Sequence, residues 1–107
     1  MLPKKNRLTA AFFRTRKQPV ISFVCGNISV RAYLPQTNVF RCAVVVPVKT
    51  AKKAVVRNQI RRSLYRVIQQ NILTLPVYDV VFFVSQLENT ELNIQTIIQK
   101  LKLIRLP

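Results

Sequence analysis

The stretch KKAVVRNQIRRSLYR (residues 52–66) constrains the fold more than any other part of the chain. At about 100° per residue, Val56, Ile60 and Leu64, together with Val67 just beyond the stretch, lie on one side of a helix. Lys and Arg occupy much of the remaining surface, and no acidic residue accompanies them. The pattern predicts an amphipathic helix that packs one face into a core and presents cations on the other.

Charge is segregated along the chain. The formal net charge is +15 in 107 residues, and residues 1–66 carry fifteen of the eighteen Lys and Arg but none of the three acids, Asp79, Glu88 and Glu91. A protein with so much unbalanced charge repels itself, so a polyanionic partner is expected. Nucleic acid is the first candidate and an anionic membrane surface is the second. A basic surface without a partner is the remaining interpretation.

The length indicates a single domain spanning residues 1–107, with one modest core that needs no metal or disulfide. Cys25 and Cys42 lack the His or Cys neighbours of a zinc site, and both lie in apolar stretches. Buried free thiols in a reducing cytosol are therefore expected. We find no signal-peptide pattern, and the runs CAVVVPV and VVFFV are too short to span a bilayer.

Hydrophobic periodicity and turn residues predict the order helix, three strands, helix, strand, helix. The expected elements are a short helix within residues 9–17, strands at VISFVC, ISVRAYL and VFRCAVVV, the basic helix, a strand at VYDVVFFVS, and a last helix beginning near Asn89 or Thr90. Gly26–Asn27 is the expected turn of a hairpin. This order predicts an α+β sandwich with a four-stranded mixed sheet.

The same patterns predict which faces are buried. VFRCAVVV is a continuous apolar run, so we expect it at the centre of the sheet, covered on both faces. Alternation in the preceding strand predicts one face made of Ile28, Val30, Ala32 and Leu34 and another made of Ser29, Arg31 and Tyr33. The residues expected on the buried side of the last helix are Leu92, Ile97, Leu101 and Ile104.

Groups for protein-based catalysis are scarce. Acid–base and nucleophilic catalysis need a group that titrates near pH 7 and a partner that orients it, but the chain has no His and only three dispersed acids. Asp79 lies in a predicted strand, where pairing with an arginine is expected. The single glycine lies in a turn, so a glycine-rich phosphate loop is absent. We do not expect a self-sufficient protein enzyme.

Arginines at spacings of four form two parallel rows on the basic helix, Arg57 with Arg61 and Arg62 with Arg66. Their planar guanidinium groups suit phosphate oxygens and also stack on bases, and Asn58 suits a base edge or a ribose hydroxyl. Four phosphate contacts would give a slope of log affinity against log salt of roughly −3 to −4. The competing interpretation is a solvated charged face.

Aromatic side chains supply the stacking surfaces that unpaired bases require. Tyr33 lies on the polar face of its strand, and Phe12 and Phe13 are adjacent, so a helix does not bury both equally. For each ring taken alone, packing in the core is the competing interpretation. Together, an aromatic sheet face beside the cationic helix predicts a cleft for single-stranded RNA.

The run FRCAVVVPVKTAKKAVVRNQIRRSLYR resembles the signature of the bacterial ribonuclease P protein subunit. In that family a strand and a basic loop lead into a helix with the pattern Ala-Val-x-Arg-Asn-Arg-x-Lys-Arg. The positions that match it in register are Ala54, Val55, Arg57, Asn58, Arg61 and Arg62. LPKKNRL and YDVVFFVS also resemble the family's first residues and late strand. The resemblance implies a two-layer αβββαβα sandwich, like the second domain of ribosomal protein S5, with a left-handed crossover.

The resemblance also implies a function. In the family an RNA subunit removes the 5′ leader of precursor tRNA with Mg²⁺ held mainly by RNA and substrate, while the protein binds the catalytic RNA and the leader. No residue of the protein is catalytic, and neither a membrane nor an obligate protein partner is implied. The residues expected to bind RNA are Lys49, Lys52, Lys53, Arg57, Asn58, Gln59, Arg61, Arg62, Tyr65 and Arg66. Those expected in a leader cleft between this helix and the sheet are Phe12, Phe13, Arg31, Ala32 and Tyr33.

The chain departs from the family pattern at several positions. Gln59 replaces the second Arg of the Arg-Asn-Arg core, and Tyr65 stands where another basic residue is common. The loop before the helix has Lys49 in place of two consecutive basic residues, and it lacks glycine. These differences concern individual RNA and metal contacts.

Two other functions share parts of this pattern. A ribosomal or other RNA-binding protein of similar fold has the same charge and aromatic content, and lacks only the specific Arg-Asn helix after a strand and basic loop. A peripheral membrane protein needs bulky apolar residues available to lipid. The apolar face of the basic helix is instead expected to be used by the core.

Overall fold

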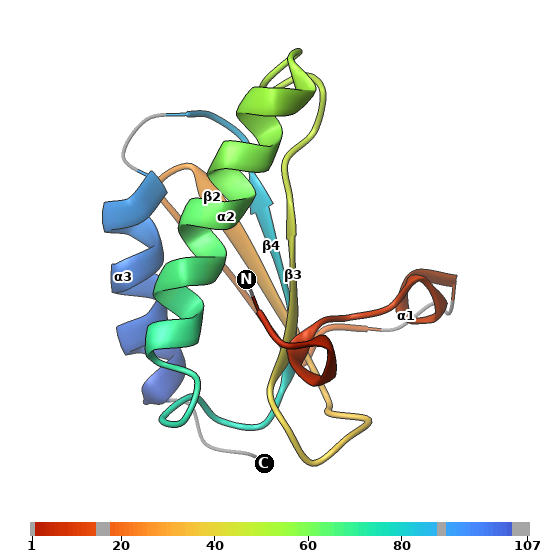
Figure 1. Cartoon of the computed structure of the whole chain (residues 1–107). Helices are drawn as coiled ribbons and strands as arrows, with labels where there is room; N and C mark the ends of the chain where they lie inside the picture. The colour runs from red at the N-terminus through yellow and green to blue at the C-terminus, as the bar shows by residue number, and fades with distance from the viewer. Residues whose placement is uncertain (1, 15–17, 88–89, 104–107) are drawn as a thin grey trace.

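The computed structural model describes residues 2–14, 18–87 and 90–103. Its elements follow in the order η1 (Lys4–Asn6, a 3-10 turn), α1 (Ala10–Arg14), β1 (Ile21–Cys25), β2 (Ile28–Tyr33), β3 (Arg41–Val45), α2 (Ala54–Gln70), β4 (Asp79–Val84) and α3 (Thr90–Lys102). This order confirms the predicted αβββαβα layout and the α+β class, with η1 as an addition before the first helix (Figure 1).

The four strands form one mixed sheet in the order β1-β2-β4-β3. β1 pairs antiparallel with β2, β2 antiparallel with β4, and β3 parallel with β4. The predicted hairpin turn is confirmed, since Gly26 between β1 and β2 adopts φ 58°, a conformation that favours glycine. Asn27 secures this turn, because its Nδ2 donates to the carbonyl oxygen of Gln86 (2.6 Å) and its Oδ1 accepts from Asn93 Nδ2 (2.6 Å).

The prediction that VFRCAVVV is the central strand is wrong. β3 lies at the edge of the sheet, and along it only Cys42 and Val44 are buried, so it alternates like a strand covered on one face. The strand with nearly continuous burial is β4, which is inserted between β2 and β3. Residues of the N-terminal segment cover the outer edge of β3, where the Leu8 N–H donates to the Cys42 carbonyl oxygen (3.0 Å).

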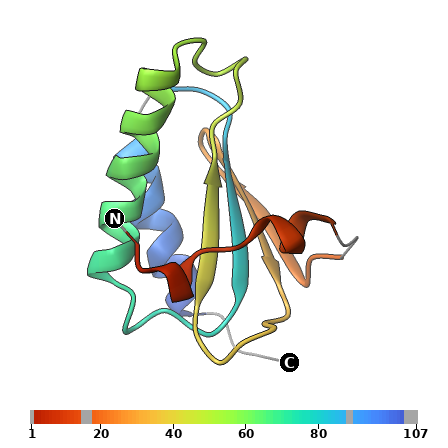
Figure 2. The ribbon, with the colours of Figure 1, turned by 45° about the vertical axis from the view of Figure 1, so that its right-hand side comes forward.

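Helices α2 and α3 cover one face of the sheet, and α1 lies on the opposite side (Figure 2). The predicted apolar stripe of α2 is confirmed, with Leu64 and Val67 buried and Val56 and Ile60 packed against the core. Ile68, also buried, extends the stripe. Each large aliphatic side chain that is fully buried contributes about 1.5–3 kcal/mol, so this stripe anchors the helix firmly.

The buried side of α3 was predicted only in part. Ile97 and Leu101 are buried as expected, but Leu92 is 64% exposed. Ile94 and Ile98 complete the stripe instead, at the spacing of three and four residues that a helix requires. Leu92 is five residues before Ile97 and therefore falls on a different side of the helix. Ile104 lies outside the described residues.

The crossover from β3 through α2 to β4 is left-handed. Viewed from the helix side with β3 running upward, the chain passes through α2 and enters β4 to the left of β3 (Figure 1). Nearly all parallel strand–helix–strand connections have the opposite hand. This connection puts α2, the basic helix, directly beside the edge strand and the N-terminal segment.

Candidate RNA interface

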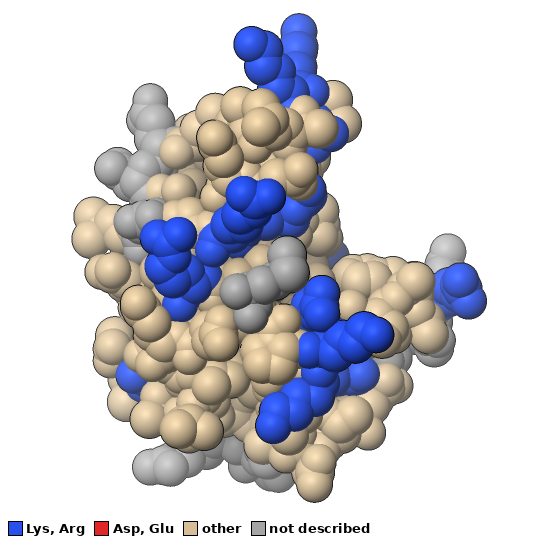
Figure 3. Space-filling model, viewed as in Figure 1, with Lys and Arg blue, Asp and Glu red and all other residues tan. Residues whose placement is uncertain are grey.

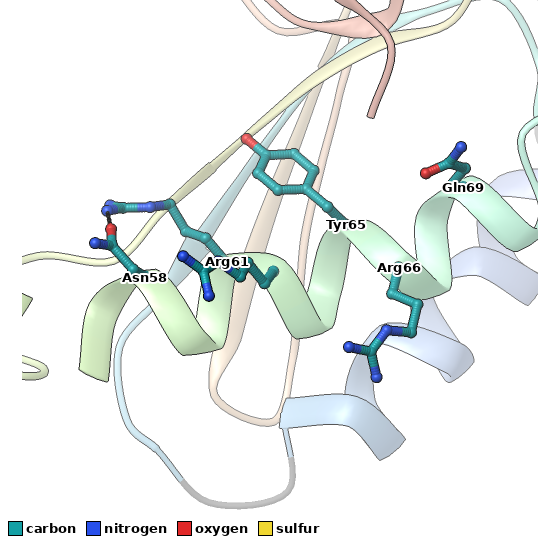
Figure 4. A pocket seen from close by; sticks show the side chains of 6 residues that line it. Asn58, Arg61, Tyr65, Arg66 and Gln69 are labelled. Carbon is teal, nitrogen blue, oxygen red and sulfur yellow. Dashed lines mark hydrogen bonds between the residues drawn. The ribbon is translucent and has the colours of Figure 1, made fainter. Parts of the chain in front are cut away.

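The exposed side of α2 forms a hollow of about 430 Å³ (Figure 4). Its described lining consists of Asn58, Arg61, Arg62, Tyr65, Arg66 and Gln69. These side chains offer guanidinium, amide and hydroxyl groups, and none of them is acidic. Figure 3 shows this face with Lys and Arg over α2 and the N-terminal segment and with no Asp or Glu among the described residues in view. The hollow is therefore suited to an anionic, hydrogen-bonding ligand.

The arginines of α2 differ in what they contact. Arg57 Nη1 donates to the carbonyl oxygens of Ala51 and Lys52, both at 2.9 Å, so it holds the preceding loop against the helix. Arg61 donates to Asn58 Oδ1, which aligns two side chains of the hollow. Arg62 and Arg66 are exposed. The two predicted rows are thus unequal, since Arg57 lies outside the hollow and stabilises the loop.

Tyr65 connects the hollow to the sheet. Its hydroxyl accepts the N–H of Val44 on β3 at 3.0 Å, and the residue packs against the hydrophobic core. Burial raises the pKa of this hydroxyl, while the hydrogen bond from Val44 and the charges of Arg61 and Arg7 lower it. Tyr65 therefore has a structural role that the helical pattern did not indicate, because the partner is a backbone group on another element.

The loop before α2 presents the predicted lysines. Lys49, Lys52 and Lys53 are all exposed, and so is Gln59 on the first turns of the helix. Ala51 is buried beneath them, and Thr50 Oγ1 donates to the Val84 carbonyl oxygen at 2.8 Å. The burial of Ala51 and the hydrogen bond of Thr50 hold the loop against the sheet, so the three lysines project from a fixed backbone.

The predicted aromatic residues meet on the other side of the sheet. Phe12 packs edge-to-face against both Phe13 and Tyr33, with ring centroids 5.2 Å apart in each pair. Phe12 is buried, Phe13 is 52% exposed and Tyr33 is partly exposed. Since α1 lies opposite α2 and α3, this group faces away from the basic helix (Figure 2).

The prediction of one cleft between the basic helix and the sheet is wrong. The space between α2 and the sheet is filled by core side chains such as Leu64 and Ile68. Strand alternation sends Ala32 into that core and Tyr33 to the opposite face. Ala32 is fully buried, so its side chain is not available to a ligand as we expected. The cationic and aromatic surfaces are separated by the thickness of the sheet.

Arg31 lies on the aromatic side, where its guanidinium carbon is 5.7 Å from the ring centroid of Phe83. Phe83 was not among the predicted residues, although alternation along β4 places it on this face with Asp79 and Val81. Asp79 is bound by Arg41 through two contacts, Nε to Oδ1 at 3.0 Å and Nη2 to Oδ2 at 2.7 Å. The expected pairing of Asp79 with an arginine is confirmed.

The donors that Mg²⁺ prefers are sparse in the described part of the chain. Within it, no group of three or more His, Cys, Asp or Glu side chains lies together. Asp79, the acid placed on the sheet, is already bound to Arg41. These side chains do not fit a magnesium site on the protein, because Mg²⁺ requires several oxygen ligands in near-octahedral geometry.

The family model described as Ribonuclease P matches residues 2–105. The chain belongs to the ribonuclease P protein family. Membership implies association with the RNA of ribonuclease P and a place in tRNA processing. Curated protein sequences gave no match.

Two solved structures of ribonuclease P proteins have the same fold. A Staphylococcus aureus mutant protein, described as defective in mRNA degradation, is 20% identical, with a TM-score of 0.70 over 92% of this chain and 86% of that chain. The Thermotoga maritima protein, in complex with a fluorophenyl thiourea, is 19% identical, with a TM-score of 0.63 over 79% of this chain and 86% of that chain.

Among the described residues, none of the helices has the length and apolar character that crossing a membrane requires.

Proposed function

We propose that this protein binds the catalytic RNA of ribonuclease P and the 5′ leader of precursor tRNA, and so assists magnesium-dependent removal of the leader by the RNA. The observation that carries the proposal is the donor-rich hollow on α2, whose described lining includes Arg61, Arg62 and Arg66 but no acid. An aromatic group on the opposite face supplies a second surface of different chemistry.

The catalytic RNA binds on the α2 side. The arginines of the hollow pair with phosphate oxygens, Asn58 and Gln69 reach ribose or base atoms, and the loop lysines Lys49, Lys52 and Lys53 contact more distant phosphates. A binding surface built mainly from charge predicts strong salt dependence, with a slope of roughly 0.7 to 0.9 for each phosphate neutralised.

The leader binds on the aromatic side. Phe13 and Tyr33 leave ring surface exposed around the buried Phe12, which suits stacking by unpaired bases. Arg31 provides a cation on the same sheet face. Because the two surfaces lie on opposite sides of the sheet, the protein holds the catalytic RNA and the leader at the same time without competition between them.

The chemistry belongs to the RNA. When bound, Mg²⁺ supplies the activated water and stabilises the charge of the leaving group. The described residues include no group of three or more His, Cys, Asp or Glu side chains, which supports the proposal that RNA phosphates and the substrate hold this ion. The protein's arginines lower the electrostatic cost of packing those phosphates together.

The test is cleavage of a precursor tRNA by the cognate catalytic RNA at low Mg²⁺, with and without the protein. We expect marked stimulation with correct 5′ ends, and tighter binding of precursor than of mature tRNA to the protein–RNA complex. Tight RNA binding without stimulation and with equal affinity for the two tRNAs would instead indicate a general RNA-binding protein of this fold.

A further inference from the structure

A second group of cations lies on the N-terminal segment, outside every surface assigned above. It consists of Lys4, Lys5 and Arg7, on and immediately after η1. Both lysines are exposed. The segment lies on the same side of the sheet as α2, beside the edge strand β3 (Figures 1 and 2). Its Lys and Arg side chains are visible on the same face as those of α2 (Figure 3).

The backbone that carries these cations is firmly held. Leu2, before the turn, is only 1% exposed and is part of the core. Asn6 is buried and its Nδ2 donates to the Phe40 carbonyl oxygen at 2.7 Å. Leu8, after the turn, donates its N–H to Cys42 on β3. Cations displayed on a fixed backbone lose less conformational entropy when they bind a ligand.

Arg7 lies between this group and the hollow on α2. Its backbone bridges to Cys42 on β3. Tyr65 contacts the same strand two residues further on, because its hydroxyl accepts the N–H of Val44 at 3.0 Å. The positive charge of Arg7 is among those that lower the pKa of Tyr65 against the rise caused by burial, which agrees with this placement. Tyr65 also lines the hollow. The N-terminal cations and the hollow therefore form adjoining parts of one surface.

One hydrogen-bond donor of the Arg7 guanidinium group has no acceptor among the described residues. This donor is the Nε atom, which is buried. Within those residues the one ion pair joins Arg41 and Asp79, so no described carboxylate neutralises Arg7 or the two lysines. A buried donor without an acceptor is costly. The solvent-excluded Nε is not itself within reach of RNA, but Arg7 as a whole is partly exposed, so its guanidinium group adds positive charge to a surface suited to phosphate.

We propose that Lys4, Lys5 and Arg7 form a second binding site for the phosphodiester backbone of RNA, continuous with the hollow on α2. The proposal rests on the proposed function, and it assigns the site to the catalytic RNA because the segment lies on the α2 side of the sheet. Lys4 and Lys5 contact phosphates of the bound RNA. Arg7 lies between these lysines and the hollow lined by Tyr65 and Arg61, so the two groups of cations bind one continuous stretch of RNA.

The test is the salt dependence of binding between the full-length protein and its cognate ribonuclease P RNA. The variant is Lys4→Ala/Lys5→Ala, and the matched control, Lys100→Ala/Lys102→Ala, removes the same charge from α3. For the variant we expect a slope shallower by roughly two, about one per lysine, and affinity at low salt weaker by roughly tenfold. The control is expected to keep the wild-type slope. Because Lys102 Nζ donates to Asn71 Oδ1 and Lys100 lies over the Phe23 ring, the melting temperature of the control is expected to fall slightly, and thermal melts verify that both variants are folded at the assay temperature.

Two outcomes overturn the site. A wild-type slope for Lys4→Ala/Lys5→Ala shows that the lysines touch no phosphate, and an equal loss in the control shows that only net charge matters. Failure of the proposed function has a different signature, because the wild-type protein then fails to stimulate cleavage of precursor tRNA. The ratio of affinities for precursor and mature tRNA is expected to be unchanged in the variant, since the leader binds on the opposite face.

Discussion

Helices α2 and α3 pack side by side on the same face of the sheet, yet their exposed sides have opposite character. The exposed side of α2 carries the arginines of the hollow, whereas the described exposed residues of α3 are Leu92, Gln95, Thr96 and Gln99, with Lys100 as a single cation. Both helices bury a regular apolar stripe. The core therefore requires only the buried stripe, and the charge on the other side of α2 remains available for the RNA binding that we propose.

The largest effects are expected where the two helices are alike. Leu64→Ala in α2 and Ile97→Ala in α3 each remove a fully buried side chain, so each is expected to lower the free energy of unfolding by about 2–5 kcal/mol. Denaturant titration checks this. If one of the helices tolerated its substitution with a change of less than about 1 kcal/mol, the two would not share one core.

The next largest effect is expected on RNA affinity, and it distinguishes α2 from α3. Arg61→Ala/Arg62→Ala/Arg66→Ala is expected to weaken binding of the catalytic RNA by about 3 kcal/mol, roughly 100-fold, and to make the salt slope shallower by roughly three. The control in α3, Gln95→Ala/Thr96→Ala/Gln99→Ala, is expected to change affinity by less than about threefold. Filter binding at several salt concentrations measures both, and similar losses in the two variants would contradict the assignment of the hollow.

Tyr65→Phe tests the connection between α2 and β3. The substitution removes the acceptor of the Val44 N–H and is expected to cost about 1 kcal/mol of stability at neutral pH. Because burial raises the pKa of Tyr65 in the folded protein, only the unfolded state ionises as the pH rises past about 10. Wild-type stability is therefore full below that pH and falls above it.

The Phe variant lacks this titration, so the difference in stability between it and wild type is expected to narrow above about pH 10. Urea titrations at pH 7 and at alkaline pH measure the difference. A gap that widens instead would show that the Tyr65 hydroxyl ionises more easily in the folded state.

The smallest effects distinguish arginines within α2. Arg62→Ala removes an exposed side chain, and its expected change in the free energy of unfolding is within about 0.5 kcal/mol. Arg57→Ala also removes the donor to Ala51 and Lys52, and is expected to cost about 1 kcal/mol. Thermal melts compare the two, and equal stabilities would show that the loop does not depend on Arg57.

Features that depend on neighbouring residues were predictable. The stripe of α2 from Val56 to Val67 follows from the 3.6-residue period, and the hairpin at Gly26 follows from the few residues that accept its turn. The basic character of the α2 surface is equally local, because residues on the side opposite the stripe must be exposed. Within the helices the prediction misplaced two residues: Leu92 of α3, which does not share the phase of Ile97 and Leu101, and Tyr65 of α2, which packs against the core.

Features that depend on distant pairing were not predictable from local pattern. An apolar run such as VFRCAVVV is compatible with a central or an edge strand, and its place depends on the insertion of β4 between β2 and β3. The left-handed crossover runs against the usual preference, and it depends on which side of β3 receives β4 while α2 covers the sheet. The separation of Tyr33 from the arginines of α2 follows from this arrangement, since α2 covers the opposite face of the sheet.

The local sequence thus predicted the helices, the strands and the strongly cationic surface of α2, because backbone geometry and side-chain periodicity act over a few residues. Strand order, crossover hand and the placement of cations and aromatic rings on opposite faces came from contacts between segments far apart in the chain. The contact between Tyr65 and the Val44 N–H and the bridge between Arg7 and Cys42 on β3 belong to this second group. Such contacts arise only when the sheet and its helices pack together, since no short stretch contains both partners.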